Sequence, residues 1–380
     1  METRASLRLA SEVMEREAVV IGGGLAGAAA ATQLARAGRD VLLLERTRTA
    51  HHKVCGEFLS REALHYLALL GMDPAALGAV PITGVRLAAC ELLVETALPF
   101  MALSLTRRTL DEAILRNAEA AGVEVQRSTS AAALSRSNSA WDLSTDQGES
   151  FSARNVFLAT GKHDLRGWLR SKGWHNDLVA LKMYFRLSQA QHAALSGFVE
   201  LILFPGGYTG LQAVENGEAN LCLLITRERL RRLNGSWEAV LEHACLHSSH
   251  LRDRLSGSQA LLDRPLALSS IPYGYRAPVG SDGVWRLGDQ TAVIPSFSGD
   301  GMSIALHSAH LATKLFLTGN TSNVYQQQMR RQLGRGICVA SALSQLLVRA
   351  PLLAQLVRVR PRLLRDIAIL TRIPESAIIR

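Results

Sequence analysis

The segment from residue 18 to residue 45 constrains the fold of this chain more than any other. It reads AVVIGGGLAGAAAATQLARAGRDVLLLE: an apolar run, a glycine-rich turn, an alanine-rich run, and a second apolar run that ends in an acid. This pattern predicts a strand over 19–21, a helix over 28–37 and a strand over 41–44. A strand, a helix and a strand in that order form one unit of a parallel sheet covered by helices.

The glycines of this unit have the spacing Gly22-x-Gly24-x-x-Gly27, directly after the first strand. Gly22 permits the tight turn, Gly24 lets the backbone approach a pyrophosphate, and Gly27 lets the helix pack on the strands. The start of the helix offers amide donors to the phosphates, and Glu45 can accept hydrogen bonds from ribose hydroxyls. The unit therefore predicts a dinucleotide site. The alternative is a glycine-rich turn in a unit that binds nothing.

Charge and cysteine content limit the classes of partner and compartment. The net charge of +9 fits anionic cofactors, acidic substrates or an anionic membrane surface. No nucleic-acid-binding motif accompanies this charge, so we expect no nucleic-acid partner. The five cysteines lack CxxC spacing, which indicates free thiols in a reducing compartment and predicts a cytoplasmic protein.

Targeting and metal-binding signals are weak. Residues 1–17 are polar and charged, and we interpret them as a loose N-terminal extension rather than a signal peptide. No run of about 18 uninterrupted apolar residues occurs, so no transmembrane helix is expected. His51 and His52 are adjacent but lack a third ligand at a sensible spacing, so we expect no metal site.

The rest of the chain alternates between helical and strand-like patterns. Up to residue 159 we expect a helix after Ser60 over 63–70, strands within 80–105, a helix over 109–121, a strand over 123–127, a hairpin over 141–151 and a buried parallel strand over 155–159. Beyond it we expect strands over 178–187, 198–204, 208–214, 219–226 and 266–275, a helix over 237–247, a buried strand from Val284, and helices over 301–317, 322–348 and 352–372.

Four fragments follow the glycine-rich unit in a fixed order. They are Arg107-x-x-Leu110-Asp111, Ala159-Thr160-Gly161, Gly288-Asp289 and Pro295-x-x-x-Gly299-Asp300-Gly301. With the opening unit, they resemble the FAD-dependent oxidoreductase family of the p-hydroxybenzoate hydroxylase fold, which also contains geranylgeranyl reductases and flavin-dependent monooxygenases and halogenases. The resemblance spans roughly residues 18–330 and implies FAD as the cofactor.

The resemblance also implies a fold class and domain boundaries. The expected fold is α/β, with a Rossmann-type FAD-binding domain, an inserted mixed or antiparallel β-sheet substrate domain and a helical C-terminal tail. The expected boundaries are an N-terminal extension over 1–17, an FAD-binding domain over 18–80, 106–174 and 276–320, a substrate domain over 81–105 and 175–275, and a C-terminal helical region over 321–380.

The implied FAD site uses each of these motifs. Glu45 would accept from the adenosine ribose, Asp289 would hold the ribitol hydroxyls, and the helix from Gly301 would point its N-terminus at the flavin. The full set implied to contact the cofactor is Gly22, Gly24, Leu25, Ala26, Gly27, Glu45, Arg46, Cys55, Gly56, Arg107, Thr160, Gly161, Gly288, Asp289, Pro295, Gly299, Asp300, Gly301 and Met302. The alternatives are a surface ion pair for Arg107, a helix cap for Asp289 and a structural turn for Thr160-Gly161.

Within the family, three segments are most similar to the geranylgeranyl reductase branch and to related flavoproteins of polyketide pathways: KVCGEFLS at 53–60, ATGKHDLRG at 159–167 and FPGGYTGLQAVENGEANLC at 204–222. The resemblance places the first segment beside the flavin. Cys55, Glu57 and Tyr208 are therefore candidate catalytic residues, and Tyr208 is expected to line the substrate pocket. The alternatives are packing for Cys55 and Tyr208 and a solvated loop for Glu57.

The resemblance implies an FAD-dependent oxidoreductase of a hydrophobic prenyl, lipid-like, polyketide or aromatic molecule. The reaction is either hydride transfer to a carbon–carbon double bond or O2-dependent hydroxylation. No second GxGxxG motif occurs, so electrons come from transiently bound NAD(P)H or from an external reductase. The motif W-x-W-x-I-P of tryptophan halogenases is absent, which disfavours halogenation. A non-catalytic, FAD-bound interaction protein is the remaining alternative.

The tail over 343–373 combines leucines at helical spacing with interleaved arginines, and Pro351 and Pro361 divide it. We expect it to cover the FAD domain or a hydrophobic substrate channel. The alternative is a peripheral contact with an anionic membrane, which would suit a lipid-like substrate.

Overall fold

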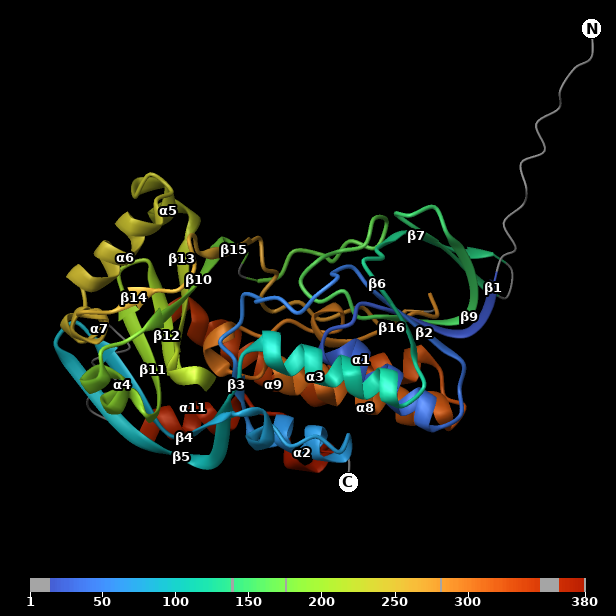
Figure 1. Cartoon of the computed structure of the whole chain (residues 1–380), viewed down its shortest axis with the longest axis horizontal. Helices are drawn as coiled ribbons and strands as arrows, with labels where there is room; N and C mark the ends of the chain where they lie inside the picture. Colours follow the sequence, from blue (N-terminus) through green and yellow to red (C-terminus); the bar gives the residue numbers. More distant parts are fainter. Residues whose placement is uncertain (1–13, 138–139, 175, 281, 349–361, 379–380) are drawn as a thin grey trace, which may run out of the picture.

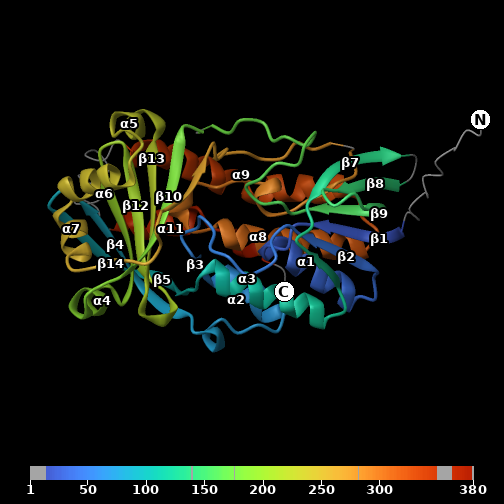
Figure 2. The same cartoon turned by 45° about the horizontal axis from the view of Figure 1, so that its top comes forward.

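A computed structural model of the chain describes residues 14–137, 140–174, 176–280, 282–348 and 362–378. The described residues form two β-sheets with helices packed between and around them (Figure 1). The strands of the first sheet run along the length of the molecule, and those of the second run across it (Figure 2).

The first sheet has seven strands in the order β6-β2-β1-β9-β8-β7, with β16 also paired to β9. Its central strands are parallel, and β7, β8 and β9 form an antiparallel meander. The strands are β1 (Met14–Ile21), β2 (Val41–Glu45), β6 (Glu124–Arg127), β7 (Ala131–Ser137), β8 (Ala140–Thr145), β9 (Ser150–Leu158) and β16 (Trp285–Arg286). β2 is buried along its whole length, as its unbroken apolar sequence requires.

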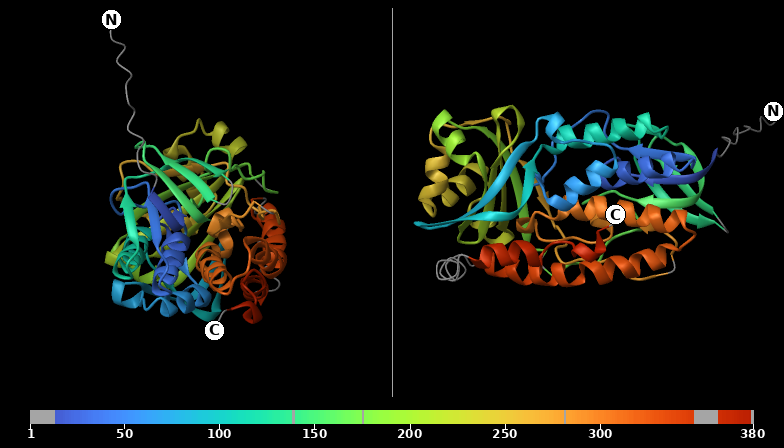
Figure 3. Two further views of the ribbon diagram at one scale, coloured as in Figure 1. Left: turned by 90° about the vertical axis from the view of Figure 1, so that its right-hand side faces the viewer. Right: turned by 90° about the horizontal axis from the view of Figure 1, so that it is seen from below.

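Helices cover this sheet and extend toward the second one. They are α1 (Leu25–Arg36), α2 (Arg61–Leu69), α3 (Arg107–Ala120), α8 (Gly301–Leu317) and α9 (Ser322–Leu347). The alanine-rich face of α1 packs closely against α8, since small side chains let two helix backbones approach. Figure 3 shows the two long helices α8 and α9, in orange, side by side along the length of the molecule.

The second sheet has nine strands in the order β14-β10-β13-β12-β11-β4-β5-β3, with β15 also paired to β10. All its pairs are antiparallel except β4 with β11. The strands are β3 (Phe58–Leu59), β4 (Val80–Ala89), β5 (Leu92–Ser104), β10 (Leu178–Arg186), β11 (Gly197–Phe204), β12 (Gly207–Ala213), β13 (Ala219–Thr226), β14 (Gln259–Ala260) and β15 (Leu266–Ser269). The accompanying helices are α4 (Gln189–Leu195), α5 (Arg227–Arg232), α6 (Trp237–Leu246), α7 (Ser249–Leu255) and, near the C-terminus, α11 (Arg362–Leu370).

Both faces of the strand β10 in the second sheet are buried. The outer face packs on α4, α6 and α7, so the alternate β10 residues Val179, Leu181 and Met183 lie in an apolar core. The inner face is turned toward the first sheet and carries Lys182 and Tyr184 of the same strand, both nearly inaccessible to solvent. A strand with two buried faces normally consists of apolar residues along its whole length, so a lysine in it is unusual.

Several elements differ from the sequence prediction. Residues 14–17 are not part of a loose extension: they belong to β1, where Met14 pairs with Phe151 of β9. The strand expected over 266–275 ends at Ser269, and the strands expected near Phe151 and over 155–159 are one strand, β9. β7, α4, α5 and α7 were not predicted, because these segments are short or mostly polar.

The α/β class is confirmed, with a helical C-terminal region; the exact domain boundaries stay a prediction. Most of the extension expected over 1–17, and residues 349–361 of the tail, lie outside the described residues. Within the described part of the chain, no helix is both long and apolar enough to cross a membrane.

Candidate active site

One cavity of about 700 Å³ connects the glycine-rich turn after β1 with the inner face of the second sheet. At the first end it is lined by Gly22, Gly24, Glu45, Arg46 and Thr129. At the other end the lining is mainly apolar and comprises Val85, Leu98, Val199, Leu201, Leu224, Leu266 and Leu268. The residues predicted for a dinucleotide and those predicted for a substrate therefore face a shared space.

The structure brings most of the predicted site residues together around this cavity. Its walls include Gly22, Gly24, Leu25, Ala26, Glu45, Arg46, Cys55, Gly56, Glu57, Arg107, Thr160, Gly161, Tyr208, Gly288, Asp289, Gly299, Gly301 and Met302. Gly27, Pro295 and Asp300 are not among the lining residues. Contact of each residue with FAD stays a prediction, and for these three the structure favours a supporting role.

The glycines on the cavity wall differ in whether the packing of the protein leaves room for a side chain at their positions. A Cβ atom on Gly27 would lie 1.9 Å from the carbonyl oxygen of Gly22, so only glycine fits the packing of α1 there. Among the described residues, a Cβ atom on Gly24 would meet no atom closer than 3.7 Å, and one on Gly56 or Gly301 would meet no atom within 4 Å. At these three positions internal packing does not demand glycine. Bare backbone on the cavity wall suits a ligand that must approach closely, as FAD does.

Two cations lie beside Gly24 at the start of α1. Arg107 makes a bidentate ion pair with Asp111, with Nε–Oδ1 and Nη2–Oδ2 distances of 2.7 and 2.9 Å, and Lys53 Nζ lies 2.7 Å from Asp111 Oδ2. Burial works against ionisation of Asp111, but Arg107 and Lys53 hold its pKa below the usual value. Two cations against one carboxylate leave excess positive charge at a helix N-terminus, which suits a pyrophosphate.

Glu45 closes the turn from β2. Its Oε2 accepts from the backbone N of Gly23 at 2.8 Å, and its Oε1 accepts from the backbone N and the hydroxyl of Thr47 at 2.9 and 2.7 Å. Burial alone would raise the pKa of Glu45, but the Thr47 hydrogen bonds and the charge of Lys53 lower it. Glu45 is thus an ionised acceptor that also fixes the glycine-rich turn, and its bond to a ribose stays a prediction.

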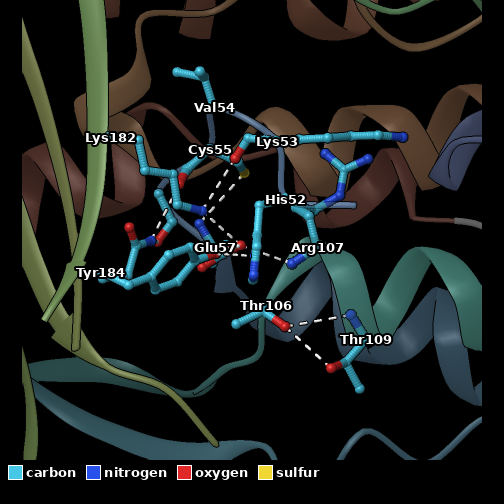
Figure 4. Close-up of polar contacts among 12 residues, drawn as sticks. His52, Lys53, Val54, Cys55, Glu57, Thr106, Arg107, Thr109, Lys182 and Tyr184 are labelled. Atoms are coloured by element: carbon cyan, nitrogen blue, oxygen red, sulfur yellow. Dashed lines mark hydrogen bonds and ion pairs between the residues drawn. The ribbon is translucent and has the colours of Figure 1, made fainter. Parts of the chain in front are cut away.

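The loop over 52–57 forms one wall of the cavity (Figure 4). Glu57 has a φ of 62°, a conformation that is uncommon outside glycine. Its Oε1 accepts from the backbone N of Arg107 at 2.8 Å and from the Tyr184 hydroxyl at 2.6 Å, and lies 2.6 Å from Nζ of Lys182. Burial raises the pKa of Glu57 against the opposing attraction of Lys182. These contacts favour a role for Glu57 in holding the loop.

Cys55 and Tyr208 are the other predicted catalytic candidates. Cys55 is half-buried on the cavity wall; its Sγ accepts from the backbone N of Glu57 at 3.3 Å and interacts with the Arg107 guanidinium. Tyr208 on β12 is 1% exposed and packs edge-on against Phe297, and burial raises the pKa of its hydroxyl. Cys55 thus lies on the cavity wall and its catalytic role stays a prediction, whereas the buried contacts of Tyr208 favour a role in shaping the pocket.

The C-terminal segment completes the cavity wall. Ile367, Ala368, Thr371 and Arg372 line it, so the part of the tail after residue 362 covers the channel. Arg372 Nη1 lies 2.7 Å from Asp300 Oδ1, and its guanidinium lies 4.5 Å from the ring centre of Phe100. Burial raises the pKa of Asp300 to about 7 despite the charge of Arg372. Asp300 thus anchors the tail beside the turn that begins α8.

Sequence reasoning missed several residues of the site. They are Lys53, Lys182, Tyr184, Gln212, Asn220 and Arg372. A lysine in the middle of the run LVALKMYF was a usable signal, since a charge in a strand with two buried faces needs a dedicated partner. The other residues have no comparable signal in a single sequence, because their roles depend on long-range contacts.

Comparisons with known proteins support FAD as the cofactor. Residues 15–156 match the family described as FAD binding domain. Menaquinone reductase of Mycobacterium tuberculosis is 26% identical over 348 residues, which cover 87% of this chain and 84% of the relative.

Two solved structures have similar folds. A flavin-dependent brominase superposes with a TM-score of 0.79 at 17% identity, over 94% of this chain and 93% of its own. The myxobacterial chondrochloren halogenase, described as FAD-dependent, superposes with a TM-score of 0.73 at 20% identity, over 96% of this chain and 92% of its own. At these identities the two halogenases bear on the fold alone.

Proposed function

We propose that this chain, an FAD-dependent flavoprotein with the p-hydroxybenzoate hydroxylase fold, reduces a carbon–carbon double bond in a hydrophobic, prenyl-type substrate. The fold and the cofactor are as predicted from the sequence motifs. The reaction and the substrate class are the proposal.

The main observation behind this proposal is that a single cavity joins the glycine-rich turn to the second sheet. Its glycine-rich end has the bare backbone and the cations that FAD needs, and its far end is lined mainly by apolar residues of the second sheet, together with the polar Glu200 and Gln212. Apolar side chains such as Leu201, Leu224 and Leu268 offer few hydrogen-bond partners, so they favour a hydrocarbon substrate over a polar one.

The choice of reduction over hydroxylation rests on the curated relatives. The mycobacterial relative, aligned over most of its length, is named for the reduction of menaquinone, a quinone that carries a polyprenyl chain. This name agrees with the three segments that resemble the geranylgeranyl reductase branch. Hydroxylation is the second candidate, supported by a squalene monooxygenase that matches over only 21% of this chain. Halogenation is the third and draws support from the fold only.

FAD, when bound and reduced, supplies a hydride, and NAD(P)H or an external reductase would supply the electrons. Saturation of a double bond adds this hydride to one carbon and a proton to the other. We assign the proton to the Cys55 thiol: its S–H bond breaks as the C–H bond forms, and water later reprotonates the thiolate. Arg107, next to this thiol, would stabilise the thiolate in the interval.

The rest of the wall excludes water and orients the substrate. Tyr208 and Phe297 form a rigid aromatic corner, and Ile367 and Ala368 of α11 close the cavity from the C-terminal side. Exclusion of water keeps the hydride donor and the proton donor from competing reactions.

A peripheral membrane contact through the tail follows from the same proposal. On α11 the cavity-facing Ile367 is followed by Ile369 and Leu370, which are 51% and 43% exposed. An apolar surface on the helix that walls the channel would let a lipid-like substrate enter directly from a bilayer.

The test is a single-turnover experiment. The FAD-loaded protein is reduced without O2 and mixed with a prenylated hydroquinone, whose ring cannot accept a hydride, or with the analogue whose chain is fully saturated. The proposal predicts return of the oxidised-flavin spectrum with the unsaturated compound only. Equal behaviour with both compounds would refute double-bond reduction.

A further inference from the structure

A completely buried lysine lies behind the cavity wall. Lys182 is 0% exposed at the middle of β10. Its Nζ lies 2.6 Å from Oε1 of Glu57, donates to the backbone oxygen of Lys53 at 3.1 Å, and lies 4.5 Å from the ring centre of Tyr184. A buried ammonium group is stable only with such partners, and two of the three come from the loop over 52–57.

Neighbouring strands hold the same loop. Tyr184 of β10 pairs with Asn220 of β13, which pairs in turn with Gln212 of β12, so the three form one row across the sheet. Asn220 Nδ2 donates to the backbone oxygens of Cys55 and Gly56 at 3.1 and 3.0 Å. Gln212 Nε2 donates to the backbone oxygen of Glu57 at 2.9 Å.

The loop needs these contacts. Its backbone forms no regular strand or helix over 52–57, and Glu57 adopts a left-handed conformation that costs energy outside glycine. The partners of its carboxylate other than Lys182 are neutral donors, Tyr184 and the backbone N of Arg107. Without Lys182, the buried Glu57 charge would lack its cation, and the loop would rearrange to reach solvent.

We infer that Lys182 is a positioning residue, which locks the loop over 52–57 onto the second sheet so that Cys55 and Gly56 face the flavin. Figure 4 shows Lys182 and Tyr184 reaching Glu57 from the sheet side of this loop. Cys55, Gly56 and Glu57 line the cavity, whereas Lys182 and Tyr184 do not, so Lys182 acts through the loop. The inference rests on the proposed function for its catalytic meaning, but its geometric content can be tested without turnover.

The test measures the reactivity of the Cys55 thiol in the FAD-loaded protein. Iodoacetamide alkylation is followed with time by peptide mass spectrometry, and the exposed Cys90 serves as the internal reference. Lys182→Met keeps the length of the side chain and removes its charge. The exposed Lys172→Met is the matched control.

Lys182→Met should raise the alkylation rate of Cys55 about tenfold, the factor that corresponds to one lost charged hydrogen bond. Cys90 should not change, and Lys172→Met should resemble the wild type. The double variant Lys182→Met/Glu57→Gln removes both buried charges and should return Cys55 to within about threefold of the wild-type rate. A double variant as reactive as Lys182→Met alone would overturn the role of the charge pair.

If Lys182→Met does not fold, the test uses Tyr184→Phe instead. This variant removes only the hydroxyl that donates to Glu57. It should raise Cys55 alkylation by about threefold. Tyr325→Phe, which removes a hydroxyl bound to the backbone oxygen of Arg286 away from the cavity, should have no effect. Unchanged Cys55 reactivity in the folded variants would overturn the inference.

Turnover gives the second readout. If the proposed function is right, Lys182→Met should also lower the rate of double-bond reduction about tenfold at unchanged FAD occupancy. If no prenyl substrate is turned over by the wild type, the proposed function fails, and the alkylation result still decides whether Lys182 positions the loop.

Discussion

The Nη2 atom of Arg107 lies 3.7 Å from the position that a Cβ atom on Gly24 would occupy. No described residue lies closer to that position, so packing within the described part of the protein does not require glycine there, and we expect the FAD pyrophosphate to lie against the bare backbone of Gly24. Gly24→Val should therefore fold normally but bind FAD more than about tenfold more weakly, because its side chain occupies the path of the pyrophosphate. Flavin absorbance of the purified variant and its FAD titration provide the measurement.

Gly27→Val is the matched control. Its side chain would overlap the carbonyl oxygen of Gly22, so it should destabilise the fold itself. Full flavin occupancy in Gly24→Val would show that the pyrophosphate lies elsewhere.

Asp289 faces the cavity from the turn after β16, and its backbone oxygen accepts from Arg170 Nη1 at 3.0 Å. Asp289→Ala keeps this backbone contact and removes the carboxylate that we expect to hold the ribitol. FAD affinity should fall about tenfold with little change in the urea midpoint. Isothermal titration with FAD checks this expectation, and an unaltered dissociation constant would remove Asp289 from the cofactor site.

The free energy of unfolding is expected to depend on pH because of Glu200 on β11. Its carboxylate is inaccessible to solvent and lies 2.8 Å from His250, 2.9 Å from Arg254 and 3.1 Å from Arg86. Burial alone would raise the pKa of Glu200, but the hydrogen bonds from His250 and Arg254 lower it from 4.5 to about 2. Because the folded pKa lies below the unfolded one, the stabilisation is present above pH 4.5 and is lost as the pH falls toward 2.

Glu200→Gln should therefore lower the free energy of unfolding by roughly 3 kcal/mol at neutral pH. The difference from the wild type should stay constant down to pH 4.5 and shrink as the pH falls from there toward 2. Urea unfolding at several pH values measures both proteins. A difference that does not depend on pH would show that the carboxylate charge is not what stabilises this cluster.

The membrane proposal predicts an effect of the exposed residues on α11. Replacing Ile369 and Leu370 with aspartate should abolish co-sedimentation with vesicles of anionic phospholipid, because charge replaces the apolar contact. The matched control is Leu246→Asp, which changes an exposed leucine on α6 of the second sheet. Equal sedimentation of the α11 variant and the wild type would exclude this surface as the contact.

The sequence predicted the parts of the site that depend on local chemistry. The turn at Gly22, Gly24 and Gly27 could be predicted because the strand, the spaced glycines and the helix follow one another directly in the chain. Asp289 lines the same cavity as Gly22 and Gly24, and its contact with the ribitol stays a prediction. The expectation over 266–275 was wrong beyond Ser269, where Tyr273 packs into the inner core without pairing as part of a strand.

The residues that hold the cavity wall could not be predicted in the same way. Lys182 and Glu57 are 125 residues apart, and their ion pair exists only because β10 passes behind the loop. Arg372 reaches Asp300 from the tail, and a single sequence contains no local pattern that links the two. Such contacts are set by the packing of whole sheets and helices.

The central claim is best tested by identifying the product of one turnover. The FAD-loaded protein is reduced in the absence of O2 and incubated with a prenylated hydroquinone, whose ring cannot accept the hydride, and the lipid is analysed by mass spectrometry. The account predicts a product that has gained two hydrogen atoms in its prenyl chain without O2. A lipid unchanged under these conditions, together with a product that gains an oxygen atom when air is admitted, would contradict it.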